Sequence, residues 1–171
     1  MKAPYAPHVK LIFAVLALSL SASALAQTSA GVQGGAFVSG FGTRPEGGVH
    51  IMTTRTSAVE VLGTNRYRVS MEGNLAAGAG GPNLLLDASL LWPSGGGSYV
   101  GAGLGSGVGF PRNGDSGLPF PAFVLTPLAL ANLHGVYGVR LDSGMTVEGM
   151  VRLKPASEGG SVTARISFPL R

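Results

Sequence analysis

The residues of this chain best suited to acid–base or metal chemistry are His50 and His134, because imidazole changes charge near neutral pH and is a common metal ligand. Neither belongs to a known motif, since the His-Glu-x-x-His and Gly-x-Ser-x-Gly patterns are absent. Asp87 and Asp115 lack the neighbours of a calcium loop. The chain has no cysteine, which excludes disulfides, thiolate nucleophiles and cysteine-ligated metals. We therefore expect no catalytic, cofactor-binding or metal-ligating residue, no cofactor, and an interior polar role for both histidines.

Charged residues recur at alternate positions in several segments and can act together electrostatically. Arginine and carboxylate side chains on one face can line a selective pore, or they can fill an interior as ion pairs, because a lone buried charge is costly. We expect the second arrangement. The expected interior polar set is Arg66, Arg68, Glu72, His134, Arg140, Glu148, Arg152 and Arg165.

The segments that must position these side chains have a period of two. In 161–170, Val162 and Ile166 alternate with Thr163 and Arg165, and similar alternation runs through 65–75, 130–141 and 144–154. Successive side chains of a strand point to opposite faces, so each segment is predicted to be a strand with one apolar face. Turn-forming residues, among them 43–47, separate eight predicted strands. These lie near 32–42, 48–62, 66–76, 84–92, 98–108, 122–141, 145–154 and 161–170.

The connections between these strands also differ in length. The short ones, 63–65, 93–97 and 142–144, fall at alternate connections, and the longest lies near 109–121. Short turns at one end and longer loops at the other are typical of outer-membrane barrels. The predicted strand 122–141 is too long for a single crossing, and Pro127 interrupts its ladder.

The segment 98–110 carries glycine on one whole face. Val100, Ala102, Leu104, Val108 and Phe110 share the other face, opposite Gly101, Gly103, Gly105, Gly107 and Gly109. Glycine weakens a strand interior, so five in register indicate a surface where backbone or large side chains come very close. The interior of a narrow barrel is such a surface.

Residues 1–26 are predicted to be a cleaved secretory signal peptide. Lys2 and Lys10 lie before an apolar stretch at 11–20. The small residues of a cleavage site follow at 24–26, so cleavage is expected after Ala26. The stretch is too short for a spanning helix, which needs about 20 residues. Residues 27–171 then form a single domain with ten basic and eight acidic residues. These basic residues are scattered, so we expect no nucleic-acid partner.

Alternation leaves open whether the apolar face looks inward or outward. A soluble barrel buries it, whereas a membrane barrel presents it to lipid and keeps polar residues inside. The glycine face, the pairable charges and aromatic residues near strand ends favour the membrane arrangement, although Arg55 falls on the apolar face. The expected interfacial aromatics are Tyr67, Trp92, Tyr99, Phe110 and Phe168.

The segment 99–105 resembles the glycine-alternating strand of small OmpA-like or opacity-type outer-membrane barrels. The hairpin 135–153 is similar to their penultimate hairpin, and 161–170 is similar to their closing strand. The chain departs from their pattern at its end, where Phe168 is followed by Pro169, Leu170 and Arg171 instead of ending the chain. The resemblance implies an eight-stranded antiparallel up-and-down transmembrane β-barrel, inserted by the barrel-assembly machinery.

We therefore expect an all-β protein of the bacterial outer membrane with a structural or envelope-integrity role, contacting outer-membrane lipid and performing no catalysis. One alternative is a secreted or periplasmic soluble barrel that binds a small apolar ligand. A second is a narrow pore or a lipid-modifying barrel enzyme, although neither histidine is followed by serine or threonine as in the small deacylating barrels. The sequence leaves the oligomeric state open.

Overall fold

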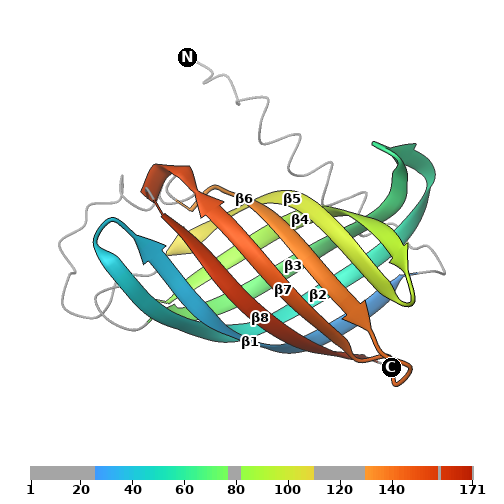
Figure 1. Cartoon of the computed structure of the whole chain (residues 1–171), viewed down its shortest axis with the longest axis horizontal. Helices are drawn as coiled ribbons and strands as arrows, with labels where there is room; N and C mark the ends of the chain where they lie inside the picture. The colour runs from blue at the N-terminus through green and yellow to red at the C-terminus, as the bar shows by residue number, and fades with distance from the viewer. Residues whose placement is uncertain (1–25, 77–81, 110–129, 158, 171) are drawn as a thin grey trace, which may run out of the picture.

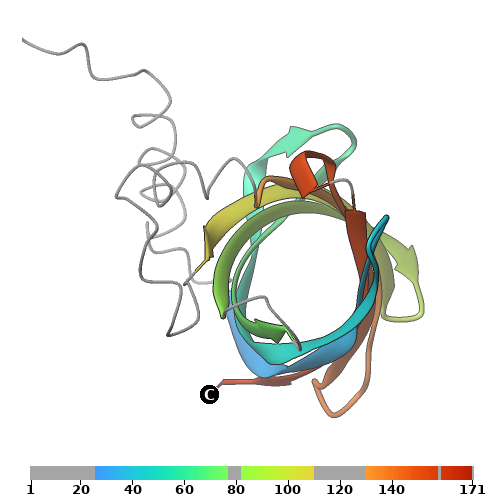
Figure 2. The same cartoon turned by 90° about the vertical axis from the view of Figure 1, so that its left-hand side faces the viewer.

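The chain forms one closed antiparallel barrel of eight strands (Figures 1 and 2). The structure is a computed structural model that describes residues 26–76, 82–109, 130–157 and 159–170. Each strand pairs with the next along the chain, and β1 pairs with β8 to close the ring. The strands are β1 (Gln27–Ser39), β2 (Gly42–Val61), β3 (Thr64–Ala76), β4 (Asn83–Gly95), β5 (Ser98–Gly109), β6 (Asn132–Arg140), β7 (Thr146–Lys154) and β8 (Gly159–Pro169).

The expected all-β barrel of eight antiparallel strands is confirmed. The only helical element in the described ranges is the three-residue 3₁₀ turn η1 (Pro155–Ser157). None of these residues belongs to a helix long and apolar enough to cross a membrane. Residues 1–25 of the predicted signal peptide 1–26, residues 110–121 of the predicted long connection and residues 122–129 of the predicted strand 122–141 lie outside the described residues.

Two sequence predictions about local structure are corrected. The turn expected at 43–47 lies within β2, and the chain reverses instead at Gly40 and Phe41. Pro45 is tolerated there because β2 pairs with β3 only from Glu46 onward, so position 45 lies on an edge that is unpaired on the β3 side, where proline is accepted. The sixth strand starts at Asn132, well after the predicted 122.

The two ends of the barrel differ. The end that we call the terminal end carries Gln27, Pro169 and three short turns at 62–63, 96–97 and 141–145. Gly96 and Gly97 both have positive φ, 56° and 77°, as a two-residue hairpin turn of the primed type requires. The opposite end, the loop end, carries the connections 40–41, 77–82, 110–131 and 155–158. The expected contrast in loop length is therefore incomplete, because the connection at 40–41 is also short.

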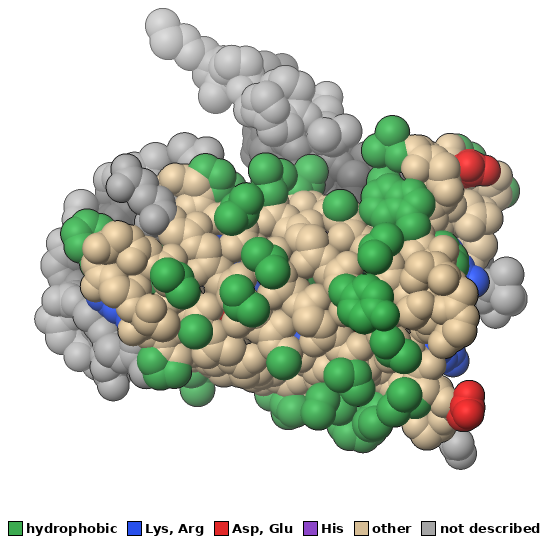
Figure 3. Space-filling view, viewed as in Figure 1, with side chains coloured by type: hydrophobic (Ala, Val, Ile, Leu, Met, Phe, Trp, Pro, Cys, Tyr) green, Lys and Arg blue, Asp and Glu red, His purple; other side chains and the backbone are tan. Residues whose placement is uncertain are grey.

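Alternation along each strand sorts polar side chains inward and apolar ones outward. In β7, every second residue from Thr146 to Lys154 is buried, and Val147, Val151 and Leu153 between them are exposed. Among all described residues, twenty polar or charged residues are buried, against five hydrophobic ones. Hydrophobic side chains are spread along the outer wall in Figure 3, and charged ones show mainly near the two ends. This distribution is the reverse of a soluble barrel.

The glycine face of β5 gives the interior its space. A Cβ built on Gly101 would lie 2.7 Å from both Leu91 Cδ2 and Val136 Cγ1. A Cβ on Gly103 would lie 2.5 Å from His134 Nε2, and one on Gly105 would collide with the Asp87 carboxylate. The side chains that lie closest to the glycine face of β5 therefore come from the two neighbouring strands, β4 and β6.

We expect Gly103→Ala to destabilise the barrel by about 1–3 kcal/mol, because the added methyl overpacks the interior. The matched control is Gly149→Ala on the exposed face of β7, where a Cβ meets nothing within 4 Å. The fluorescence of Trp92, the single tryptophan, can follow urea unfolding of both variants in detergent. Equal midpoints for the two variants would contradict the close approach.

Candidate functional site

A network of six buried charged residues occupies the middle of the bore. Arg152 Nη2 lies 2.5 Å from both Glu72 Oε1 and Asp87 Oδ2, so one guanidinium joins strands β7, β3 and β4. Arg165 of β8 also donates to Glu72. All of these side chains are at most 1% exposed. The strand register therefore brings together charges that are 65 to 93 residues apart in the chain.

A second ion pair lies closer to the terminal end. Arg68 of β3 donates to Glu148 of β7, and the Tyr99 hydroxyl donates to the same carboxylate oxygen. Arg165 Nη1 lies 3.9 Å from the other oxygen of Glu148, which joins this pair to the first group. We call the six residues Arg68, Glu72, Asp87, Glu148, Arg152 and Arg165 the interior charge network; its three cations balance its three carboxylates.

The structure places six of the eight expected interior residues at buried positions: Arg68, Glu72, His134, Glu148, Arg152 and Arg165. Arg66 and Arg140 have the same inward register but are exposed, because they lie at the open terminal end. Sequence reasoning missed Asp87, the partner of Arg152. Its signal was weak because the run Leu84–Leu85–Leu86 hides the alternation in β4, although Asp87, Ser89 and Leu91 do share the inner face.

His50 and His134 each hydrogen-bond to a serine inside the barrel. His50 Nε2 lies 2.8 Å from Ser167 Oγ, and His134 Nε2 lies 2.9 Å from Ser89 Oγ. His134 Nδ1 also lies 3.1 Å from Asn132 Oδ1, which gives a serine–histidine–asparagine relay. Such a relay is the arrangement of a nucleophile, a base and an orienting group. Ser89, His134 and Asn132 are each at most 5% exposed, so in this conformation the relay is closed to a substrate.

The expected aromatic positions divide into two groups. Tyr67, Trp92 and Phe168 lie on the outer wall towards the terminal end, and Phe110 lies outside the described residues. The Tyr67 hydroxyl donates to the Val59 carbonyl at 2.5 Å, and Trp92 Nε1 donates to the Leu62 carbonyl at 2.9 Å. Both hydrogen bonds stabilise the end of the β2–β3 hairpin.

The prediction for Tyr99 is wrong: its side chain lies inside the barrel, against the buried cluster of Leu91, Val136 and Met150. Its register explains this position, since it shares the glycine face of β5 rather than the face of Val100.

Arg55 is the exception on the outer wall. It pairs in register with the outward-facing Tyr67 and is partly buried. The β2–β3 ladder shifts register between Thr56 and Val61, immediately after it. Of the charged residues in the eight strands, only Arg55 and Glu60, which lies beyond the shift, depart from the inward register.

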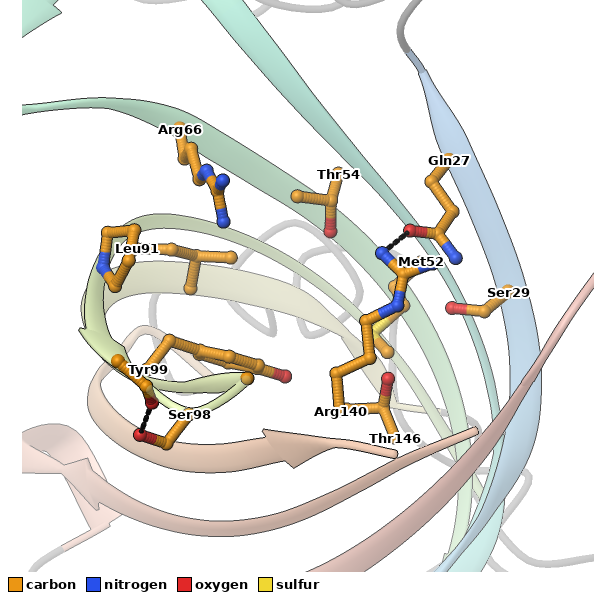
Figure 4. Close-up of a pocket in the computed structure, with 13 residues that line it drawn as sticks. Gln27, Ser29, Met52, Thr54, Arg66, Leu91, Ser98, Tyr99, Arg140 and Thr146 are labelled. Atoms are coloured by element: carbon orange, nitrogen blue, oxygen red, sulfur yellow. Dashed lines mark hydrogen bonds between the residues drawn. The ribbon is translucent and has the colours of Figure 1, made fainter. Parts of the chain in front are cut away.

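An open cavity of about 310 Å³ lies inside the terminal end of the barrel (Figure 4). Its lining combines hydroxyl groups, the apolar side chains of Met52, Leu91 and Pro93, and two guanidinium groups. The polar and aromatic lining side chains are Gln27, Ser29, Thr54, Arg66, Ser98, Tyr99, Arg140 and Thr146. No group of three or more metal-ligating side chains occurs in the part of the chain that the structure describes.

Comparisons of the chain with protein-family models, with curated proteins and with solved structures found no match.

Removing one partner of the Arg68–Glu148 pair should leave the other charge buried without its partner and lower the free energy of unfolding by about 3–5 kcal/mol. We expect Arg68→Met and Glu148→Gln each to lower the urea midpoint strongly. The double variant should be more stable than the sum of the two losses predicts, because it restores charge balance. Arg44→Met, an exposed arginine at the loop end, is the control. Strictly additive losses would show that the two charges do not interact.

Proposed function

We propose that this protein is an outer-membrane β-barrel whose role is structural, stabilising the bacterial envelope without catalysing a reaction. The observation that carries the proposal is the reversal of inside and outside: the interior holds the charge network and the outer wall is apolar. Lipid is the solvent in which such a wall is favourable, since apolar side chains gain nothing by facing water.

The outer wall has the composition and dimensions that lipid contact requires. Val32, Val49, Leu104, Leu133 and Val162 are each more than half exposed, and they come from five different strands. The shortest strands, β6 and β7, have nine residues, which meets the roughly 9–11 residues that a tilted membrane strand needs. Because β1 pairs with β8, the ring has no first or last strand with a wholly unpaired edge, as a hydrocarbon environment demands.

The aromatic side chains support the same orientation. Tyr67 and Trp92 use their polar atoms to bind backbone carbonyls near the terminal end, while their rings lie on the wall. Rings placed in this way suit the boundary between lipid and water. By resemblance to small opacity-type barrels, the terminal end faces the periplasm, the signal peptide directs export, and the barrel-assembly machinery inserts the chain.

The two non-enzymatic alternatives fit the interior less well. A soluble carrier of apolar ligands needs an apolar cavity at its centre, whereas this centre holds six charged side chains. An open pore needs a continuous aqueous path, whereas the charge network and the cluster of Leu91, Val136 and Met150 occupy the middle of the bore. Eight-stranded barrels in general have interiors that side chains fill.

Val151→Arg tests the lipid-facing wall directly. Val151 lies on the outer face of β7 and is 51% exposed. Arginine near the middle of a bilayer costs about 2–4 kcal/mol, whereas the same change on a water-exposed strand stays within about 0.5 kcal/mol. We expect the large loss for unfolding from lipid vesicles. Phe41→Arg, at the exposed turn of the loop end, is the control and should have little effect.

The location of the natural protein provides a separate check. It should remain with the membrane fraction after a high-salt wash, and its gel migration in detergent should change on heating. Recovery of the folded protein in the soluble fraction would exclude the proposed membrane location.

The serine–histidine–asparagine relay supports a second candidate, a barrel enzyme that hydrolyses lipid esters. Ser89 would be the nucleophile, His134 the base and Asn132 the orienting group. Against it, the relay is buried in the bore, behind the strand wall that lipid would contact.

We expect the protein reconstituted in phospholipid vesicles to release no more fatty acid than its Ser89→Ala variant. Turnover that disappears in the Ser89→Ala variant, while its folding is unchanged, would establish the enzyme and overturn the purely structural role. His134→Gln provides an independent check on the same relay, because it removes the proposed base.

A further inference from the structure

We propose that the cavity at the terminal end binds a small water-soluble organic anion, a carboxylate or phosphate monoester that carries a short apolar or aromatic group. The inference concerns the bore and does not depend on what covers the outer wall. The volume of the cavity, about 310 Å³, lies at the lower end of the range for ligand pockets.

The charge of the cavity is positive and uncompensated. Arg66 from β3 and Arg140 from β6 both point into it (Figure 4), and no carboxylate is among its lining residues. Neither guanidinium forms an ion pair within the described part of the chain, in contrast to the three arginines of the interior charge network. Guanidinium groups are suited to bind carboxylate or phosphate oxygens, because each presents paired N–H donors in a fixed plane.

One of these two arginines is already held in place. Arg140 Nη1 donates to the Gln27 side-chain oxygen at 2.6 Å, across the mouth of the cavity from β6 to β1. A guanidinium has five N–H donors, so this bond leaves others for a ligand. A preorganised donor loses less conformational freedom when it binds.

The remaining lining explains why the ligand needs an apolar part. Met52 and Leu91 are both 4% exposed and present aliphatic surface, and Tyr99 adds an aromatic ring. The Tyr99 hydroxyl is bonded to Glu148, whose charge is matched by Arg68, so the carboxylate behind the ring does not oppose an anion. Hydroxyl groups of Ser29, Thr54 and Thr146 complete the wall.

The surroundings define how the ligand enters. The closed strand ring separates the cavity from anything that contacts the outer wall, so a solute enters along the barrel axis from the terminal end. Leu91 belongs both to the cavity lining and to the buried cluster with Val136 and Met150, so apolar side chains continue from the cavity into the bore. The site therefore retains a solute from the aqueous phase and gives no lateral access to a lipid headgroup.

Phenyl phosphate is a suitable probe, measured by titration calorimetry with the full mature barrel in non-ionic detergent and corrected for an empty-micelle blank. We expect saturable binding with a dissociation constant of roughly 0.1–1 mM at low salt, as a ligand of this size with two charged contacts allows. Arg66→Met and Arg140→Met should each weaken binding about tenfold, the effect of losing one charge-assisted hydrogen bond. Arg44→Met should leave it unchanged.

Several results would overturn the assignment. They are an absence of saturable binding, an unchanged affinity in the Arg66→Met/Arg140→Met double variant, and equal affinity for benzyl alcohol, which lacks the charge. Equal affinity for inorganic phosphate would remove the apolar subsite. Displacement of phenyl phosphate by phosphatidylglycerol added to the micelles would identify a lipid headgroup as the occupant instead. Heat-dependent gel migration of every variant shows whether the barrel remains folded.

Discussion

The balance of charge inside the bore is the constraint on which the rest of this structure depends. Moving a guanidinium or a carboxylate out of water costs several kcal/mol, and only a close partner of opposite sign offsets that cost. Arg68, Arg152 and Arg165 lie against Glu72, Asp87 and Glu148, so the interior carries no net charge from these six groups. Because the partners come from β3, β4, β7 and β8, the network forms only when the ring has closed.

The glycine face of β5 is the steric counterpart of this network. Side chains from β4 and β6, among them Asp87, Leu91 and His134, lie where Cβ atoms on β5 would otherwise be. Glycine lowers the intrinsic stability of β5 as a strand. The absence of Cβ atoms on this face leaves space for the side chains of β4 and β6 that meet near the barrel axis, and their packing offsets that loss. The strand pairing on both sides keeps β5 in place despite its weak propensity.

The inward side chains at the two ends of the barrel differ because the interior charge network occupies only the middle of the bore. Beyond Arg68 and Glu148, the inward positions towards the terminal end include hydroxyl groups, Tyr99 and two arginines without an ion pair in the described part of the chain, and a cavity remains. Towards the loop end, Lys154 lies 5.0 Å above the ring of Phe37, an inward aromatic of β1.

The sequence by itself determined the strand number, the alternation and most of the charged residues that share the inner face, because a period of two is a local property of each segment. Of the buried charged residues, it did not include Asp87 and Lys154. It placed Arg68, Glu72, Glu148, Arg152 and Arg165 together correctly. It could not assign partners, because Glu72 and Arg152 are 80 residues apart and only the register of the closed ring brings them together. Tyr99 was misplaced since an aromatic near a strand end suits either face, and Asp87 was hidden in a leucine run.

Only the tertiary structure decided the difference between a buried and an exposed inward position. Arg66 and Arg68 are two residues apart and share a face, yet one lines an open cavity and the other is 1% exposed. Depth along the barrel axis makes that difference, and depth follows from how the strands are staggered around the ring rather than from any one segment.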